Sequence, residues 1–419
     1  MTPLYQAILE MPGVDIHSHL RGKHTEANDL GEVFFYHVAA QAMVAAGMPP
    51  DLMKPERPVD ERIKDALPYM AKIRNTTMFW VIKESLRVIH GFDAEDFSWA
   101  NWEGLCRKIE ATSGQPGWAR EVLCNKAKLS LSITSTPRGR GDIADDQRDF
   151  LDYTCEQPVT HADILGYLER GKEPITTTEA LNAALEAHLA HEMDEHEAGS
   201  FTYWPQRGFA CPPEEAPNVD AILEARARAM TSGVSPMHAL QPEQVHALDG
   251  AVAYRALPII NERGLPFVMC IGITMNAHGR TLLRYDPTEA GEIFKMMLRY
   301  PRINYSLMAG NVAHSHELNT IAKQMPNAYM ACSWWHGMYP QYAERELAER
   351  LEMIPYNRLV AVITDAYSAE WSVARSLLSR LVLARVLEQK VAAGEYSEAF
   401  ALEIAAAMLD GNAREVFAR

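Results

Sequence analysis

The chain is poor in cysteine, with six among 419 residues. These cysteines are scattered without a CxxC pair, so their spacing gives no sign of a disulfide framework. No cleavable signal segment opens the chain either, and we therefore expect reduced thiols and a cytoplasmic location. The six are Cys106, Cys124, Cys155, Cys211, Cys270 and Cys332.

Long apolar runs and basic clusters are also missing. No apolar run reaches the roughly 20 residues that a helix needs to cross a bilayer, so we expect no membrane partner. Lys and Arg number 40 against 55 Asp and Glu, a formal net charge of −15, and this balance predicts no nucleic-acid partner. The glycines of residues 138–142 lack the strand-turn-helix spacing of a phosphate loop, so we expect no nucleotide cofactor.

The chain does have a globular composition, with 47% hydrophobic and 23% charged residues and no low-complexity segment. A chain of 419 residues can bury a large core. We expect all of it to fold, as one large domain with an embellishment.

A histidine pair close to the N-terminus is the first candidate site. Residues 14–19 follow a Pro-Gly turn signal and are predicted to form a buried strand, on which alternate side chains share one face. His17 and His19 are two residues apart, so both imidazoles could hold one divalent metal, and a third, anionic ligand is then required. Two solvent-exposed histidines without a role are the alternative interpretation.

Apolar strand candidates and helical stretches alternate along the rest of the chain. This alternation is typical of parallel strands joined by crossover helices, and eight such units predict an α/β fold, a (β/α)8 TIM-type barrel. The predicted strands are 14–19, 128–134, a weak candidate at 155–163, 200–204, 266–273, 302–307, 328–334 and 359–364. The predicted helices between them include 119–126, 178–195, 218–230, 242–263, 287–300, 317–324, 342–352 and 366–388.

A mainly helical insertion is predicted after the first strand. Residues 32–48 have apolar residues at helical spacing and end at Gly47, and the helical pattern continues to about residue 112. We therefore divide the chain into a barrel, residues 1–30 and 113–419, and a helical insertion, residues 31–112.

Asp365 is the candidate anionic ligand. It ends the last apolar strand, and in a (β/α)8 barrel the functional groups lie at the C-terminal ends of the strands, where His17 and His19 also lie. Asp is also a favoured N-cap, and a helix follows soon afterwards, so a capping role is the alternative.

Four segments resemble the amidohydrolase superfamily and, within it, the uronate isomerase family. Two histidines separated by one residue near the start of the chain, together with the Thr-Asp pair at residues 364–365, are typical of the superfamily. The adjacent tryptophans at residues 334–335 point to the uronate isomerase family. The four are residues 15–20 followed by His37 in its helix, residues 132–137, residues 331–335, and residues 362–367 with the long helix to residue 388.

This resemblance implies a barrel with a helical insertion, one divalent metal, usually zinc, and interconversion of an aldose uronate with its ketose. His17, His19 and Asp365 match the family's metal ligands. Asp365 could also act as the base that moves a proton between two carbons. His37 matches the histidine of the family's insertion helix, where the neighbouring tyrosine is replaced by Val38.

The candidate substrate site departs from the family pattern. Tyr367 stands where an arginine usually grips the substrate carboxylate, and a tyrosine cannot replace a bidentate, charge-assisted pair. Cys270 stands for a strand-five histidine and is a candidate metal ligand. The arginine of the family's arginine-proline-aspartate run is replaced by His161, and residues 206–208, with Arg207 in the middle, stand for its aspartate-histidine-glycine run.

Further candidates carry open alternatives. His336 is a candidate acid or base, although packing would explain it equally well. Trp334 and Trp335 are candidates for a sugar-stacking wall, with core packing as the simpler explanation, and Arg207 or Arg138 could replace the lost carboxylate grip. His188 and His191, with His196, lie in an acidic helical stretch that we interpret as a solvated face, with a second metal site as the alternative.

Three functions follow from these features. The first is a metal-dependent isomerase of a uronate or a related small sugar acid, and the second is a metal-dependent hydrolase of an amide or lactone. The third is a barrel that binds sugar acids without catalysis. The acidic surface and the aromatic-rich insertion that the sequence predicts for this protein are compatible with a homo-oligomer.

Overall fold

Eight parallel strands form the central sheet of the structure, a computed structural model that describes residues 2–156, 164–204, 218–232, 240–275, 281–332 and 334–417. The strands follow one another in chain order, and a separate antiparallel hairpin, β6 (Ile273–Met275) and β7 (Thr281–Leu283), follows the fifth strand. The strands of the sheet are β1 (Gly13–Ser18), β2 (Leu129–Thr134), β3 (Leu151–Cys155), β4 (Ser200–Tyr203), β5 (Phe267–Ile271), β8 (Tyr305–Ala309), β9 (Ala328–Ala331) and β10 (Leu359–Val360).

Backbone hydrogen bonds join the two ends of this sheet. The N–H of Ile16 donates to the carbonyl of Val362 at 3.3 Å, and the N–H of Asp365 donates to the carbonyl of His17 at 3.0 Å. The N–H of His19 donates to the carbonyl of Ala366 at 2.8 Å. The segment that continues β10 therefore pairs with β1, and the predicted (β/α)8 barrel is confirmed.

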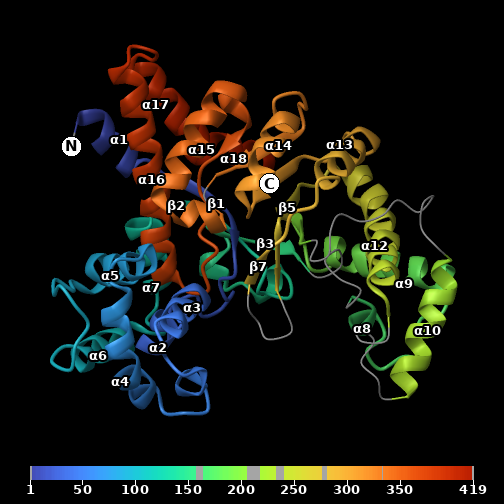
Figure 1. Cartoon of the computed structure of the whole chain (residues 1–419), viewed down its shortest axis with the longest axis horizontal. Helices are drawn as coiled ribbons and strands as arrows, with labels where there is room; N and C mark the ends of the chain where they lie inside the picture. Colours follow the sequence, from blue (N-terminus) through green and yellow to red (C-terminus); the bar gives the residue numbers. More distant parts are fainter. Residues whose placement is uncertain are drawn as a thin grey trace.

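Helices surround the strands (Figure 1). In that view α16 lies at the upper left with α1 and α17, the helices between β1 and β2 lie below it, and α8, α9, α10 and α12 lie on the right. The helices that precede β4 are α1 (Pro3–Glu10), α2 (Leu30–Phe34), α3 (His37–Ala45), α4 (Val59–Met70), α5 (Thr77–His90), α6 (Trp102–Thr112), α7 (Trp118–Arg120), α8 (Ile164–Leu168) and α9 (Thr178–Asp194). Those that follow β4 are α10 (Val219–Thr231), α12 (Pro242–Arg263), α13 (Glu289–Arg299), α14 (Val312–Ala322), α15 (Pro340–Met353), α16 (Ala369–Ala392), α17 (Glu398–Ala406) and α18 (Asn412–Phe417).

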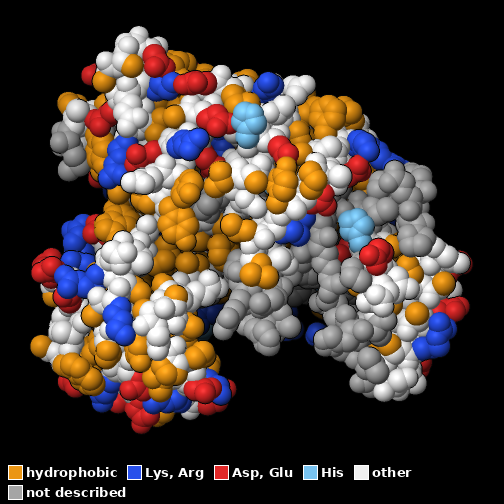
Figure 2. Space-filling model, in the orientation of Figure 1, with side chains coloured by type: hydrophobic (Ala, Val, Ile, Leu, Met, Phe, Trp, Pro, Cys, Tyr) orange, Lys and Arg blue, Asp and Glu red, His pale blue; other side chains and the backbone are white. Residues whose placement is uncertain are grey.

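The face drawn in Figure 2 is hollowed between two groups of helices, α2 to α6 on one side and α8 to α10 on the other. Lys and Arg are interspersed with Asp and Glu over the part of this face that the structure describes. The barrel interior is apolar: side chains of alternate strand positions form one buried cluster, which includes Val14, Ile16, Ile133, Val268, Met308 and Ile363. This packing makes the barrel a filled scaffold whose strand ends carry the polar groups.

Several predicted elements are wrong in their bounds: the helix predicted at 317–324 is α14, Val312–Ala322, and two further differences have a clear cause. Residues 32–48 form two helices, α2 and α3, because Tyr36 leaves the helical conformation with ψ 136°. The Tyr36 ring packs on Trp371, with centroids 4.0 Å apart, and its hydroxyl donates to the carbonyl of Asp365. These contacts with the barrel explain the break. The third strand lies before the candidate at 155–163, at Leu151–Cys155, because Asp152 and Thr154 hide the apolar alternation.

The helices α2 to α6 lie between β1 and β2, as the predicted insertion requires, and no strand is described in this part of the chain. The division of the barrel and the insertion at residues 30 and 113 stays a prediction. No helix of the described residues combines the length and the apolar character needed to span a membrane. No disulfide joins the five described cysteines, and Cys211 lies outside the described residues.

Acid will destabilise the insertion through His90, at the end of α5. Burial and the nearby Lys108 charge lower the pKa of His90 from 6.5 to about 4. The unfolded state therefore binds an extra proton between these pH values, and stability falls as the pH drops through the window. Allowing for partial solvent access, we expect this group to cost roughly 2 kcal/mol between pH 6.5 and 4.

Urea unfolding at several pH values checks this expectation. In His90→Phe the stability should depend less on pH within the window, by about that amount. The exposed His24→Phe is the matched control and should keep the wild-type dependence. Equal slopes for wild type and His90→Phe would contradict the assignment.

Candidate metal centre and adjoining cavity

Three side chains meet at the C-terminal ends of the first and last strands. His17 Nε2 lies 3.5 Å from Asp365 Oδ1, and His19 Nε2 lies 3.3 Å from the same oxygen. One donor atom of each residue lies within 4.8 Å of the others. The structure therefore brings together the two histidines and the aspartate that the sequence singled out.

Local sequence explains how each ligand reaches this point. His17 and His19 both reach Asp365 Oδ1, so the two imidazoles share one side at the end of β1, where the strand register shifts between Asp15 and Ser18. Asp365 has φ 53°, in the left-handed region that Asp and Asn tolerate better than most residues. This backbone turn ends the strand segment at Asp365, beside the two imidazoles.

Asp15 ties the first strand to the last below the three ligands. Its Oδ2 accepts hydrogen bonds from Thr364 Oγ1 at 2.5 Å and from Ser132 Oγ at 2.9 Å, and its Oδ1 accepts one from the N–H of Thr364 at 2.9 Å. Complete burial raises the pKa of Asp15 to about 6, although these hydrogen bonds oppose the rise. Asp15 thus connects β1, β2 and the segment of Asp365, a positioning role that the sequence did not reveal.

The electrostatics of the centre favour an ionised aspartate. Burial alone would raise the pKa of Asp365, but hydrogen bonds from His17 and His19, together with their charges, hold it well below its usual range. Burial likewise opposes protonation of His19, whereas Asp365 and Glu156 raise its pKa above the usual value. An anionic oxygen therefore faces two imidazole nitrogens.

These residues fit a divalent metal. Two imidazoles and one carboxylate are a common donor set for zinc and for neighbouring transition metals. The other nitrogen of His19, Nδ1, is hydrogen-bonded to Ser135 Oγ at 2.8 Å, which fixes the orientation of the ring. The buried Nδ1 of His17 has no hydrogen-bond partner within the part of the chain that the structure describes.

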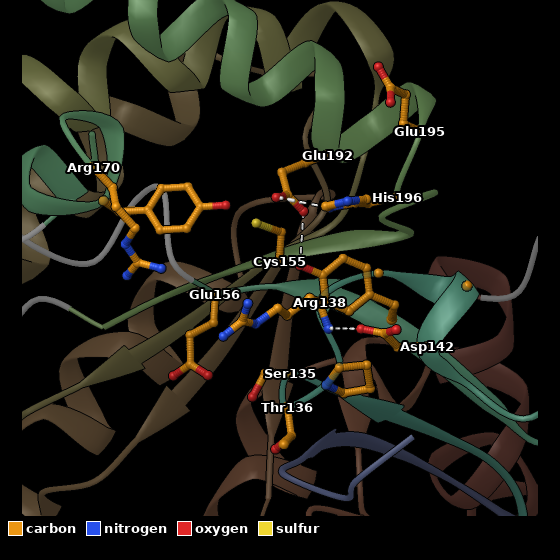
Figure 3. A pocket seen from close by; sticks show the side chains of 15 residues that line it. Ser135, Thr136, Arg138, Asp142, Cys155, Glu156, Arg170, Glu192, Glu195 and His196 are labelled. Carbon is orange, nitrogen blue, oxygen red and sulfur yellow. Dashed lines mark hydrogen bonds and ion pairs between the residues drawn. The ribbon is translucent and has the colours of Figure 1, made fainter. Parts of the chain in front are cut away.

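A cavity of about 750 Å³ adjoins the centre (Figure 3). Two residues of its wall, Ser135 and Glu156, contact His19. The Oε2 atom of Glu156 lies 3.9 Å from His19 Nδ1. Figure 3 shows Ser135, Thr136 and Glu156 on one side of the cavity and Cys155, Glu192 and His196 on the other. A cavity of this size holds a small polar molecule next to the three ligands.

Charged groups line this cavity. The guanidinium groups of Arg138 and Arg170 both belong to its wall, and among the described residues neither forms an ion pair with a carboxylate. Arg138 was a candidate from the sequence, whereas Arg170 and Glu156 were missed. A carboxylate directly after β3 was a usable signal for Glu156, but the third strand had been expected too late in the chain.

Tyr367 stacks on the imidazole of His19. Its ring lies 4.7 Å from that of His19 at an interplanar angle of 27°, and 5.7 Å from the ring of Tyr36. Tyr367 thus borders the centre, and its place beside a substrate stays a prediction. Tyr36, one residue before His37, is a second tyrosine at the centre, whereas the sequence comparison considered only position 38.

The remaining candidates are less well defined. Trp334 is buried in the barrel interior, and Trp335 is half-buried. The centroids of their rings lie 6.3 Å apart, and the two rings are nearly perpendicular. Cys270 is buried in the same interior cluster and does not join the group of ligand atoms around Asp365. Burial, with the charges of Glu156 and Asp365, raises the pKa of the Cys270 thiol well above its usual value, which disfavours the thiolate that binds metals. Its assignment as a ligand stays a prediction.

Four candidates cannot be compared with the structure. His161 and Arg207 lie outside the described residues, and the side chains of His37 and His336 are not described. His37 begins α3, and His336 lies in the short helix Trp335–Met338 that follows β9. Their catalytic and binding roles stay predictions.

The arrangement of the strands and helices is shared with known enzymes. A uronate isomerase from Thermotoga maritima superposes with a TM-score of 0.82 at 16% identity, over 99% of this chain and 96% of that one. The chain has the fold of the uronate isomerases. A second uronate isomerase, from Bacillus halodurans, superposes with a TM-score of 0.76 at 14% identity, over 99% and 95% of the two chains.

The same fold occurs in an inferred metal-dependent hydrolase from Lactobacillus casei, with a TM-score of 0.66 at 13% identity, over 100% of this chain and 98% of that one. Neither a family model nor a curated protein sequence matches the chain. The resemblance inferred from the sequence is thus confirmed at the level of the uronate isomerase fold. At these identities the likeness describes the scaffold, and the chemistry has to be argued from the residues.

Proposed function

We propose that this protein is a metal-dependent aldose-ketose isomerase of a uronate or a related sugar acid. The observation that carries the proposal is the meeting of His17, His19 and Asp365 beside a cavity lined by arginines. The uronate isomerase fold supports it, because functional groups of (β/α)8 barrels lie at this end of the strands.

We propose zinc as the metal and assign His17, His19 and Asp365 as the residues that would hold it. A divalent ion supplies a Lewis acid that polarises carbonyl and hydroxyl oxygens of a bound sugar. Ser135 and Asp15 contribute indirectly, by holding His19 and the strand of His17 in position.

The interconversion requires a base that removes the proton from C2 of the aldose and returns it to C1, while a proton moves from the C2 hydroxyl to the C1 oxygen. Two carboxylates lie close to His19: Glu156, in the cavity wall, and Asp365, beside the imidazole. Either lies near enough to the centre to exchange this proton, and His37 and His336 stay further candidates. Separate Asn and Gln variants of the two carboxylates identify the base.

We assign Arg138 and Arg170 as the residues that bind the substrate carboxylate. Tyr367 occupies the position of the usual arginine, and the two wall arginines offer the charge-assisted donors that a tyrosine lacks. The aromatic ring of Tyr367, stacked on His19, then borders the sugar and limits its position.

The test is an assay of the metal-reconstituted protein with glucuronate and galacturonate, in which NMR detects the ketose. In Arg170→Met we expect KM to rise about 30-fold with a smaller change in kcat, because the lost charged hydrogen bonds contribute about 2 kcal/mol to binding. Arg263→Met, which removes a surface ion pair with Asp194, is the matched control and should behave as wild type. Absence of turnover with every uronate tested would overturn the isomerase.

A hydrolase of amides or lactones is the second candidate. The likeness to the Lactobacillus casei protein favours it, and the same three ligands could serve to activate water. A lactone and amide series in the same assay separates the two, since turnover there without uronate conversion would identify the hydrolase. Binding of sugar acids without any turnover would instead point to a non-catalytic barrel.

A further inference from the structure

A second group of metal-ligating side chains lies on the other side of the cavity. We propose that Cys155, His188 and Glu192 bind a second divalent cation with the ligand preferences of zinc. One donor atom of each residue lies within 4.8 Å of the other two. This site is separate from His17, His19 and Asp365 and does not depend on the isomerase assignment.

The three residues come from two neighbouring elements. Cys155 is the last residue of β3, and His188 and Glu192 are one helical turn apart on α9, so their side chains share one face of the helix. His188 Nδ1 lies 3.8 Å from Glu192 Oε1. The acidic sequence of this part of α9 predicts a solvated face, and this prediction is wrong for His188 and Glu192, which are both buried.

Burial makes the group costly without a cation. Cys155, His188 and Glu192 are 1%, 8% and 3% exposed, and the buried Nε2 of His188 has no hydrogen-bond partner among the described residues. An unsatisfied buried nitrogen costs about 1–3 kcal/mol. A ligand bond from this Nε2 atom to a metal would remove that cost.

The buried carboxylate of Glu192 is paired with histidines and with no lysine or arginine among the described residues. Its carboxylate accepts a hydrogen bond from the Tyr153 hydroxyl at 2.9 Å, and His196 Nδ1 lies 3.3 Å from its Oε1. Within the described residues its ion-pair partners are histidines alone, without a lysine or arginine. A divalent ion between this carboxylate and a cysteine thiolate would balance both negative charges.

The donor set also fits the chemistry of zinc. Sulfur, imidazole nitrogen and carboxylate oxygen are its usual protein ligands, and three of them leave a fourth position for water or substrate. Cys155 and Glu192 both belong to the cavity wall (Figure 3), so this open position would face the same space as the first centre. A sugar acid bound in the cavity could then be held from both sides.

Metal analysis of the full-length protein tests the proposal. After zinc reconstitution we expect about two ions per chain in the wild type, and about one in Cys155→Ala and in Asp365→Asn, because each variant removes a ligand of a different site. His191→Ala is the matched control: His191 lies on the same helix, its side chain is only half-buried, and the variant should keep both ions. Equal zinc content in Cys155→Ala and wild type would overturn the second site.

Cobalt substitution gives a readout that does not depend on activity. His17, His19 and Asp365 supply no sulfur, so a thiolate-to-cobalt charge-transfer band that persists in Cys270→Ser reports the second site. We expect the band in wild type and in Asp365→Asn, and its loss in His188→Gln, which keeps the cysteine. A cobalt-loaded wild type without the band would overturn the proposal even if Cys155→Ala did not fold, and the cluster would then be a hydrogen-bonded group around Glu192.

Discussion

Asp365→Asn will lower the affinity of the first metal centre at least about 100-fold and kcat at least about 1000-fold, while leaving the fold intact. The carboxylate oxygen lies within 3.5 Å of both imidazoles and is the anionic donor of the group. Asparagine has the same size and tolerates the left-handed backbone at this position, so the substitution removes charge without straining the turn. Metal titration and steady-state kinetics measure the two losses.

His17→Ala should reproduce the loss, and His316→Ala supplies the control. His316 lies on α14, where it is exposed and pairs with Glu349, so its removal should change neither metal affinity nor kcat. Circular dichroism of the metal-free proteins should superpose for all variants. If Asp365→Asn and His17→Ala kept the wild-type metal content and rate, the catalytic centre would lie elsewhere.

Arg380→Leu will lower the free energy of unfolding by about 3 kcal/mol. The guanidinium of Arg380 is buried, and it donates to the carbonyls of Met11 and Lys128, at 3.0 and 2.8 Å from Nη2. These carbonyls precede β1 and β2, so Arg380 joins the long helix α16 to the starts of two neighbouring strands. Leucine leaves the Met11 carbonyl without these donors and removes one of the two donors of the Lys128 carbonyl, which also accepts from the Gly13 N–H at 2.9 Å.

Urea unfolding measures this loss, and Arg385→Leu is its control on the same helix. Arg385 pairs with Glu344 at the surface, at 2.8 Å, and such pairs contribute between about 0 and 1 kcal/mol. Burial also lowers the pKa of Arg380 to about 10, so its contribution should weaken at strongly alkaline pH. Similar unfolding midpoints for the two variants would rule out the special role of Arg380.

The meeting of the three candidate metal ligands was predictable because each depends on local pattern. Alternation along one strand puts His17 and His19 on the same face, and strand order in a barrel puts Asp365 next to them. Apolar runs interrupted by helical periods also identified most of the strands. Where polar residues interrupt a buried strand, as Asp152 and Thr154 do in β3, the pattern did not show the element.

The second cluster shows the opposite situation. His188 and Glu192 lie in an acidic run that local pattern assigns to solvent, whereas packing of α9 against the barrel buries both beside Cys155. Periodicity indicates that two residues share a helix face, but it does not say what that face meets. The break at Tyr36 has the same origin, because a contact with Trp371 and Asp365 outweighs the helical preference of residues 32–48.

Residue spacing along the chain was therefore enough to predict the barrel, the helices after the first strand and the meeting of His17, His19 and Asp365, because these follow from strand and helix periods and from strand order. The cavity wall, with Arg138, Arg170 and Glu156, and the group of Cys155, His188 and Glu192 became visible only in three dimensions. They join residues from different units of the barrel, and the contacts between such units depend on how side chains pack across the whole fold.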